Sequence, residues 1–205
     1  MNISTYIIIF TCIFSISAIN NHSIFNKFQF NPYQTKEKKE WYRFLSHAFL
    51  HADYMHLLVN MFVLFFFGRN VELYFNHFFA EKGIFYFIGL YIGGILFSVL
   101  PTYQKHQNDS WYNSVGASGA VSAIVFSSII FDPFNKICLY GLLCFPGILW
   151  GIFYLGYSYY MGKKGGDNIN HDAHLGGAIF GVLFTLAAKP QLALDFLNQI
   201  ITLFN

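Results

Sequence analysis

Four polar residues stand inside long apolar stretches of the sequence, where a polar side chain is costly and is by default a functional candidate. They are His56 and Asn60 in one stretch, Ser118 in a second and His174 in a third. A serine hydroxyl is a weak nucleophile until a base removes its proton, and a nearby imidazole is the usual base. The oxyanion formed on attack needs donors, which His56, Asn60 and the Ser118 backbone amide would supply.

Small residues accompany both the serine and the histidine. Gly116 and Gly119 stand beside the serine, so that a substrate backbone can approach its hydroxyl. Gly177 and Gly181 follow the histidine at a spacing that lets helix backbones come close together. We therefore expect the histidine-bearing helix to press against the serine-bearing helix, as a Ser–His hydrogen bond requires.

The composition predicts a membrane protein. Of 205 residues, 55% are hydrophobic and 11% are charged, whereas about 25% are charged in a typical soluble domain. The formal net charge is +2 and the basic residues are scattered, which argues against a nucleic-acid partner. The 26 Phe and 14 Tyr suit a surface in contact with a lipid bilayer. We expect an all-α polytopic membrane protein with no cofactor and no metal.

Apolar runs predict six transmembrane helices in a single domain, residues 1–205. A helix needs about 20 apolar residues to cross a bilayer. The first run has no basic n-region, so we interpret it as a retained span, with a cleavable signal peptide as the alternative. The expected spans are 3–19, 54–79, 83–100, 114–131, 137–159 and 172–188, followed by an amphipathic surface tail at 192–204.

We expect some connections between these spans to be folded and others to be mobile. Loop 20–52 is rich in aromatic residues and is predicted to fold onto the membrane surface. Pro101 is expected to end the third span and Pro146-Gly147 to kink the fifth. Loop 162–170 is rich in Lys and Gly and is interpreted as mobile. The positive-inside rule does not decide the orientation, because the result depends on whether the first loop is counted.

The three cysteines all lie inside apolar runs. Cys12 belongs to the first span, and Cys138 and Cys144 belong to the fifth. A thiol in such surroundings behaves as a small apolar side chain. We therefore expect three buried thiols rather than a disulfide.

Structural roles remain open for the candidate residues. Ser114, Ser118 and Ser122 repeat every four residues, so Ser118 is also consistent with helix packing. His174 is also consistent with a hydrogen-bonded core histidine. Glu72 is expected to satisfy backbone amides of a loop. The glycines are packing residues under either interpretation.

A metal site and an aspartyl protease are weaker alternatives. His47, His51 and His56 lack the glutamate of a His-Glu-x-x-His metal motif. We expect the first two to stabilise the first loop by hydrogen bonds. An aspartyl protease would need two aspartates within the spans, but Asp132 and Asp167 lie in a turn and a loop.

Three motifs occur in order between residues 40 and 185, and each would be weak evidence alone. They are His47, His51 and His56-Leu57-x-x-Asn60-Met61 with Gly68 and Glu72; Gly116-Ala117-Ser118-Gly119; and Ala173-His174-Leu175-Gly176-Gly177 with Gly181. Together they resemble the rhomboid family of intramembrane serine proteases, in its bacterial-type six-span form.

The resemblance implies a six-helix bundle with a long folded first loop. It implies Ser118 as the nucleophile, His174 as the base of a dyad without an acid, and His56, Asn60 and the Ser118 amide as the oxyanion hole. Substrates would be transmembrane proteins cut in or near a helix, admitted through a lateral gate at span five and the loop before it. The N-terminus would be cytoplasmic and the first loop outside, in the inner membrane of a bacterium.

The sequence departs from this family at two places. Many members carry an aromatic residue one turn after the nucleophile, which stacks on the base, and this chain has Ser122 there. Another group, such as a tyrosine of span five, is then expected to orient the base. Trp41-Tyr42-Arg43 stands where the family often has Trp next to Arg.

Two classes of function remain open. The first is an active protease. The second is a catalytically silent rhomboid-like protein that binds membrane clients, with a transporter as a weaker alternative. Inactive relatives usually lose the serine or the base, and this chain keeps both Ser118 and His174, which favours the enzyme.

Overall fold

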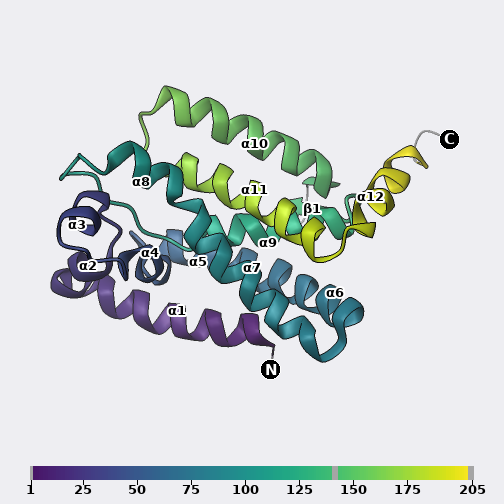
Figure 1. Cartoon of the computed structure of the whole chain (residues 1–205), viewed down its shortest axis with the longest axis horizontal. Helices are drawn as coiled ribbons and strands as arrows, with labels where there is room; N and C mark the ends of the chain where they lie inside the picture. Colours follow the sequence, from purple (N-terminus) through teal and green to yellow (C-terminus); the bar gives the residue numbers. More distant parts are fainter. Residues whose placement is uncertain (1, 140–142, 203–205) are drawn as a thin grey trace.

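The computed structural model describes residues 2–139 and 143–202, which form a bundle of helices with one two-stranded hairpin (Figure 1). A π-helical turn, η2, joins α5 to α6, and η1 and η3 are short 3-10 turns. The elements in chain order are α1 Ile3–Ile19, α2 His22–Phe28, α3 Pro32–Glu37, α4 Arg43–Ser46, η1 His47–Phe49, α5 Tyr54–Val63, η2 Leu64–Gly68, α6 Arg69–Phe79, η3 Ala80–Lys82, α7 Gly83–Ser98, α8 Leu100–His106, α9 Ser118–Phe131, β1 Lys136–Leu139, β2 Leu143–Pro146, α10 Gly147–Lys164, α11 His171–Ala188 and α12 Gln191–Ile201.

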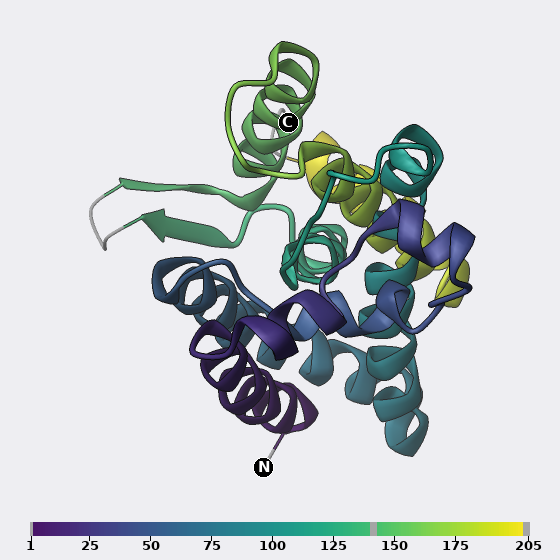
Figure 2. The same ribbon diagram turned by 90° about the vertical axis from the view of Figure 1, so that its left-hand side faces the viewer.

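Helix α9 lies at the centre of the bundle, with α5, α7 and α11 packed around it (Figure 2). Twelve of its 14 residues are buried. The first half of the helix consists mostly of Gly, Ala, Ser and Val, which lets the neighbouring backbones approach. Elements that are far apart in the sequence therefore meet on α9.

Glycines bring α7 and α11 onto this central helix. A β-carbon added at Gly177 would collide with the backbone of Gly119, and one at Gly181 would collide with the Ala123 carbonyl. On the other side, a β-carbon at Gly94 of α7 would lie 2.9 Å from the Ala123 side chain. The close approach of the helices, predicted from the spacing of small residues, is confirmed.

Large apolar side chains cover the outer surfaces of the helices. By length and composition, the helical stretch Tyr54–His106, which turns back at η3, qualifies as a membrane span. Helices α11 and α12, bent by 110° where they meet, qualify as a pair, while α1 and α9 are apolar but shorter. Exposed apolar surface of this extent is typical of contact with a membrane. Exposed examples are Phe10, Phe62, Phe85, Phe153 and Leu183.

Arg43 organises the segment between α1 and α5. Its buried guanidinium donates to the Glu40 carboxylate at 2.6 Å and to the Gln29 carbonyl at 2.6 Å. A buried charge is tolerated only when it is paired in this way. Phe30 and Ser114 exchange two backbone hydrogen bonds of 2.9 Å. The segment is thereby attached to the loop that leads into α9.

Glu72 fixes the start of α1. Its carboxylate accepts hydrogen bonds from the backbone N–H groups of Ile3 at 3.0 Å and Ser4 at 2.6 Å. The first N–H groups of a helix lack partners within the helix and favour a negative charge. The expectation that Glu72 satisfies loop amides is therefore wrong, because the amides belong to a helix N-terminus.

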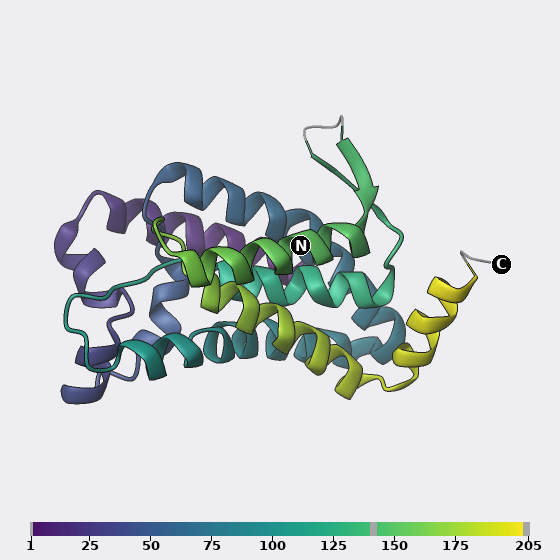
Figure 3. The same cartoon turned by 90° about the horizontal axis from the view of Figure 1, so that it is seen from above.

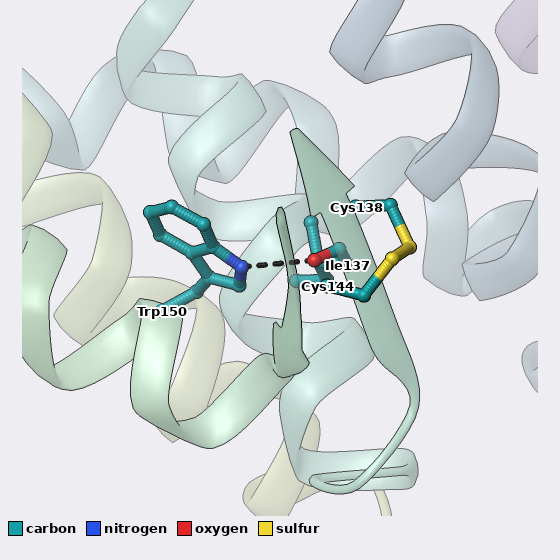
Figure 4. Close-up of a disulfide and its surroundings, with 4 residues drawn as sticks. All are labelled: Ile137, Cys138, Cys144 and Trp150. Atoms are coloured by element: carbon teal, nitrogen blue, oxygen red, sulfur yellow. Dashed lines mark hydrogen bonds between the residues drawn. A yellow bond between two sulfur atoms is a disulfide. The ribbon is translucent and has the colours of Figure 1, made fainter. Parts of the chain in front are cut away.

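A β-hairpin occupies the region in which the fifth helix is expected to begin, and it projects away from the helices (Figure 3). Helix α10 starts only after Pro146, because a proline inside a helix removes a hydrogen bond and clashes with the preceding turn. The Trp150 indole N–H donates to the Ile137 carbonyl at 3.0 Å, which joins the hairpin to α10 (Figure 4). The predicted helical span 137–159 is therefore wrong at 137–139 and 143–146, which form strands, and residues 140–142 lie outside the described residues. At Gly147 a strand meets a helix instead of a kink.

Cys138 and Cys144 form a disulfide within this hairpin (Figure 4). The antiparallel register sets them opposite each other, with their Cα atoms 3.9 Å apart. On a helix, residues six apart would point to different sides, so the strand pairing is what brings the two sulfur atoms together. The expectation of buried thiols is wrong for this exposed pair, while Cys12 is a half-buried free thiol.

Other boundaries also differ from those expected. Helix α9 begins at Ser118 rather than four residues earlier, because Gly116 has a φ of +123°, outside the helical region. Pro101 does not end the helical stretch but lies in the first turn of α8, where proline is tolerated. Helix α10 continues to Lys164, into the loop expected to be mobile. Residues 203–204 of the predicted tail lie outside the described residues.

Candidate active site

A cavity of about 1060 Å³ lies among α5, α9, α10, α11 and the loop before α11. Its lining includes His56, Asn60, Ser118 and His174, the four polar residues that stand out in the sequence. Three separate apolar stretches therefore bring their polar side chains to one place. A serine, two imidazoles and an amide facing one cavity are the groups that acyl transfer requires.

Ser118 is the first residue of α9, so its backbone N–H has no partner within the helix. Gly116, two residues earlier, has a φ of +123°, which glycine adopts at little cost. A β-carbon at Gly116 would lie 2.8 Å from Cε1 of His56. At Gly119, a β-carbon would collide with Ser98 of α7. Both glycines thus let other groups approach the serine closely.

His47 and His51 hold the loop that leads to the serine. The His47 carbonyl accepts from the Gly116 N–H at 3.0 Å, and its Nδ1 lies 3.0 Å from the Arg43 carbonyl. His51 Nε2 accepts from the Ala117 N–H at 3.4 Å. Burial lowers the pKa of His47 to about 4 and that of His51 to about 3, so both rings are neutral near pH 7. A neutral ring nitrogen can accept a hydrogen bond, which is what His51 does here.

These histidines also bear on the metal alternative. The rings of His51 and His56 meet edge to face, with their centroids 4.9 Å apart. Within residues 2–139 and 143–202, no group of three or more His, Cys, Asp or Glu side chains is arranged to hold a metal ion. The hydrogen bonds that the side chains of His47 and His51 make within the described residues are with the backbone and a serine hydroxyl.

His56 and Asn60 lie one turn apart on α5, whose N-terminus is capped by the Asp53 side chain. His56 Nδ1 accepts from the Ala52 N–H at 3.4 Å, so the proton of the neutral ring lies on Nε2. The Asn60 amide donates one hydrogen to the His56 carbonyl at 2.9 Å and keeps a second hydrogen. Both side chains therefore retain an N–H donor for a group in the cavity.

His174 lies in the first turn of α11, a helix capped by the Asn170 side chain. Its ring stacks on Tyr154 of α10, with centroids 5.7 Å apart and an interplanar angle of 24°. On another side it meets the edge of the His171 ring, at 5.8 Å and 80°. No hydrogen bond joins the Ser118 hydroxyl to this ring in the described part of the chain. Such contacts are often long in ligand-free enzymes and shorten with substrate.

Tyr154 of α10 contacts the ring of His174. Because position 122 is a serine and not an aromatic residue, the sequence leads us to expect that a tyrosine of span five orients the base, without saying which one. In the structure, the tyrosine that stacks on His174 is Tyr154. Its hydroxyl lies 2.6 Å from the Ser122 hydroxyl. Helix α10 carries Tyr154, Tyr157, Tyr159 and Tyr160, so only its rotation against α11 decides which tyrosine reaches the histidine.

The loop before α11 contains contacts that the sequence analysis does not anticipate. Asp167 and His171 lie 3.0 Å apart, and this hydrogen bond lowers the pKa of the Asp167 carboxyl. Asn170 and Thr102 are joined by hydrogen bonds of 3.0 and 3.1 Å. The loop is thereby attached to α8 and α11 at the edge of the cavity.

Comparison with known proteins identifies the family. The family model of the Rhomboid domain matches residues 38–191. RHOMBOID-like protein 12, mitochondrial, of Arabidopsis thaliana is 31% identical over an alignment of 144 positions, which covers 65% of this chain and 42% of that protein. Rhomboid-like protein 11, chloroplastic, of the same plant is 29% identical over an alignment of 178 positions, which covers 76% of this chain and 56% of that protein.

A bacterial relative extends over more of the chain. Rhomboid protease AarA of Providencia stuartii is 28% identical over an alignment of 216 positions, which covers 91% of this chain and 69% of that protein. The chain thus spans 42% and 56% of the length of the two plant relatives. The matched segment, residues 38–191, includes every polar residue singled out in the cavity and most of the chain. The chain therefore belongs to the rhomboid family.

Proposed function

We propose that the chain is an intramembrane serine endopeptidase that hydrolyses peptide bonds in or near the transmembrane helices of membrane-protein substrates. The observation that carries this proposal is the cavity that Ser118, His174, His56 and Asn60 line together. The name of the bacterial relative, a rhomboid protease, supports the same reaction class. The reaction needs no cofactor.

In this proposal Ser118 is the nucleophile and His174 is the general base. His174 removes the hydroxyl proton as the Ser118 oxygen attacks the scissile carbonyl, and a tetrahedral oxyanion forms. The imidazolium then donates the proton to the leaving amine, and the other half of the substrate remains bound to Ser118 as an acyl ester. Water, deprotonated by the same imidazole, attacks this ester; the imidazolium then protonates the departing Ser118 oxygen as the acid product leaves, which restores the serine and the base.

The oxyanion is stabilised by three N–H donors. These are Nε2 of His56, the second amide hydrogen of Asn60 and the backbone N–H of Ser118. Hydrogen bonds to neighbouring backbone groups fix the side chains of His56 and Asn60 before substrate arrives. Little reorganisation is therefore needed at the moment of reaction. Gly116 lets the His56 ring lie close to the loop that carries the serine, because a β-carbon there would lie 2.8 Å from Cε1 of His56.

The same proposal makes the protein a multi-pass component of a bacterial inner membrane. The six spans are α1, α5 with η2 and α6, α7, α9, α10 and α11. The apolar side chains on the outer faces of these helices support this assignment. The start of α1, the hairpin and α12 lie at one end of the bundle, and we place this end in the cytoplasm (Figure 1).

Substrate helices are proposed to enter sideways from the lipid, between α5 and α10. The cavity lining includes Val59 and Val63 of α5 and Trp150 of α10. Apolar side chains suit a passing transmembrane helix, and a small residue in the substrate would expose its backbone to Ser118.

A silent client-binding protein is the second candidate. The observation that favours it is the lack of a hydrogen bond between Ser118 and His174 in the described structure. The same cavity would then hold a client helix without cutting it. The retained serine, histidine and oxyanion donors favour the enzyme.

A cleavage assay decides between the two. Purified protein in liposomes is incubated with a model single-span substrate, and wild type is compared with Ser118→Ala and His174→Ala. Loss of the nucleophile or the base is expected to lower cleavage by at least ~10³-fold. Ser128→Ala changes a serine of α9 that does not line the cavity and serves as the control.

Active-site labelling gives an independent measurement. A fluorophosphonate is expected to modify wild type and the control variant at Ser118, and to leave Ser118→Ala unmodified. Wild type that binds the substrate, but neither cuts it nor reacts with the probe, would establish the client-binding alternative.

A further inference from the structure

Of the four long helices around the cavity, α5, α9, α10 and α11, helix α10 is the least buried. Only Gly147, Gly151 and Ser158 of its 18 residues are buried, whereas twelve of the 14 residues of α9 are buried. The end-on view shows α10 outermost, above α11 and α9 (Figure 2). An element with few buried apolar contacts is displaced at a low free-energy cost.

One side chain of α10 nevertheless reaches the reacting groups. The Tyr154 ring stacks on His174 at 5.7 Å and 24°, and its hydroxyl lies 2.6 Å from that of Ser122. Ser122 is 4% exposed and stands one turn after Ser118 on the same helix. The tyrosine is thus placed by the helix that carries the serine, and it contacts the ring on α11.

His174 depends on this contact for its orientation. In the described structure its side chain makes no hydrogen bond, and its ring is held by Tyr154 on one side and by the edge of His171 on another. A catalytic histidine needs a third group that fixes the plane of its ring, a task that an aspartate performs in a Ser-His-Asp triad. In this chain, the group that fixes the plane of the His174 ring is Tyr154, which lies on the loosely packed helix α10.

We propose that Tyr154 is a positioning residue that couples the place of α10 to the orientation of His174. With α10 packed against α9, the tyrosine holds the imidazole toward Ser118. When α10 moves outward, the stack and the hydroxyl contact are lost together, and the base loses its orientation. This inference rests on the proposed protease function and adds that the site is assembled only when α10 closes.

Substitution of Tyr154 tests the positioning role. Tyr154→Leu removes the ring and is expected to lower kcat about tenfold, the size of an aromatic stacking contribution, with KM changed less than twofold. Tyr154→Phe keeps the ring and is expected to stay within about threefold of wild type. The rate of fluorophosphonate labelling of Ser118 should follow kcat. Tyr160→Ala, an exposed tyrosine of the same helix, is the control.

A rescue experiment separates positioning from general damage. The hydroxyls of Ser122 and Tyr154 are 2.6 Å apart, so an aromatic ring at position 122 would fill the space left by the tyrosine. Ser122→Phe in the Tyr154→Leu background is expected to restore most of the lost kcat. A merely structural role predicts no such recovery.

A double-mutant cycle tests the coupling to α10. A β-carbon at Gly151 would lie 3.1 Å from Ile129 and 3.4 Å from Phe126, so Gly151→Val pushes α10 away from α9. We expect this change to lower kcat in wild type and to have little further effect in Tyr154→Leu, because the stack is already absent. Additive effects would overturn the coupling.

The outcomes distinguish a failure of the positioning role from a failure of the proposed protease function. An active wild type whose kcat is unchanged by Tyr154→Leu would overturn the positioning role alone. A wild type that neither cuts substrate nor reacts with a fluorophosphonate would overturn the proposed function, and this inference with it. Should Tyr154→Leu fail to fold, kcat and labelling of the rescued double variant, compared with those of Ser122→Phe alone, carry the test.

Discussion

Asn60 is placed to donate a hydrogen bond at the point where negative charge develops in the proposed reaction. One amide hydrogen is used by the His56 carbonyl at 2.9 Å, and the side chain lines the cavity with Ser118. Removing one oxyanion donor typically costs up to ~10²–10³-fold in kcat. We expect Asn60→Ala to lower kcat by up to ~10²-fold with a small change in KM, measured in the cleavage assay.

The control for this variant lies on the same helix. Leu58→Ala alters an exposed side chain of α5 and is expected to leave kcat unchanged. Both variants should unfold near the wild-type temperature. An unchanged turnover in Asn60→Ala would remove this residue from the oxyanion hole.

Among individual residues, the sequence singles out the four polar side chains that line the cavity but does not single out the tyrosine that contacts His174. His56, Asn60, Ser118 and His174 are conspicuous because a polar side chain is expensive in an apolar span, and all four line one cavity. Tyr154 is one of several tyrosines on an aromatic helix. Its selection depends on how α10 is rotated against α11, which no local pattern encodes.

Helices α9 and α11 come into close contact because glycines, which have no side chain, lie where the two helices meet. A β-carbon at Gly177 would collide with the backbone of Gly119, which cannot give way as a flexible side chain does. We expect Gly177→Ala to destabilise the protein by about 1–3 kcal/mol, the usual cost of overpacking. Thermal unfolding in detergent would show this as a lower unfolding temperature.

Gly156→Ala is the matched control. Gly156 also lies within a helix, but nothing is within 4 Å of the position that its β-carbon would take. Alanine is favoured over glycine in a helix by about 0.5–1 kcal/mol, so this variant should be as stable as wild type or more stable. Equal losses in the two variants would show that packing against α9 does not explain the effect.

Among the helices and strands, the sequence predicted most helices correctly and failed at the hairpin. Small residues spaced four apart predicted the contact between α9 and α11, since a helix brings such residues onto one face and lets a neighbouring backbone approach. The apolar run around Cys138 and Cys144 fits either a helix or a strand, because such a run carries no period. Pro146 favours the strand, since it prevents a helix from continuing through it.

The whole molecule has two distinct ends, although the charge pattern does not say which faces the cytoplasm. The start of α1, the hairpin and α12 lie at one end, and α2, α3 and the loop before α9 lie at the other (Figure 1). Helix α9 begins at Ser118 and runs for 14 residues toward the hairpin, which is about 20 Å at ~1.5 Å per residue. The serine and the hairpin therefore belong to opposite halves of the bundle.

Cysteine labelling in cells tests which end is cytoplasmic. In a background without the native cysteines, Trp111→Cys in the loop before α9 and Lys136→Cys in β1 place thiols at exposed positions. The loop before α9 and the hairpin lie at opposite ends of the bundle (Figure 1). With a cytoplasmic N-terminus, we expect a membrane-impermeant reagent to label position 111 in intact spheroplasts and position 136 only after lysis. The reverse pattern would place the hairpin outside, in an oxidising compartment where the disulfide of Cys138 and Cys144 persists. Labelling of both positions from one side would contradict the six-span assignment itself, because an odd number of spans must separate them.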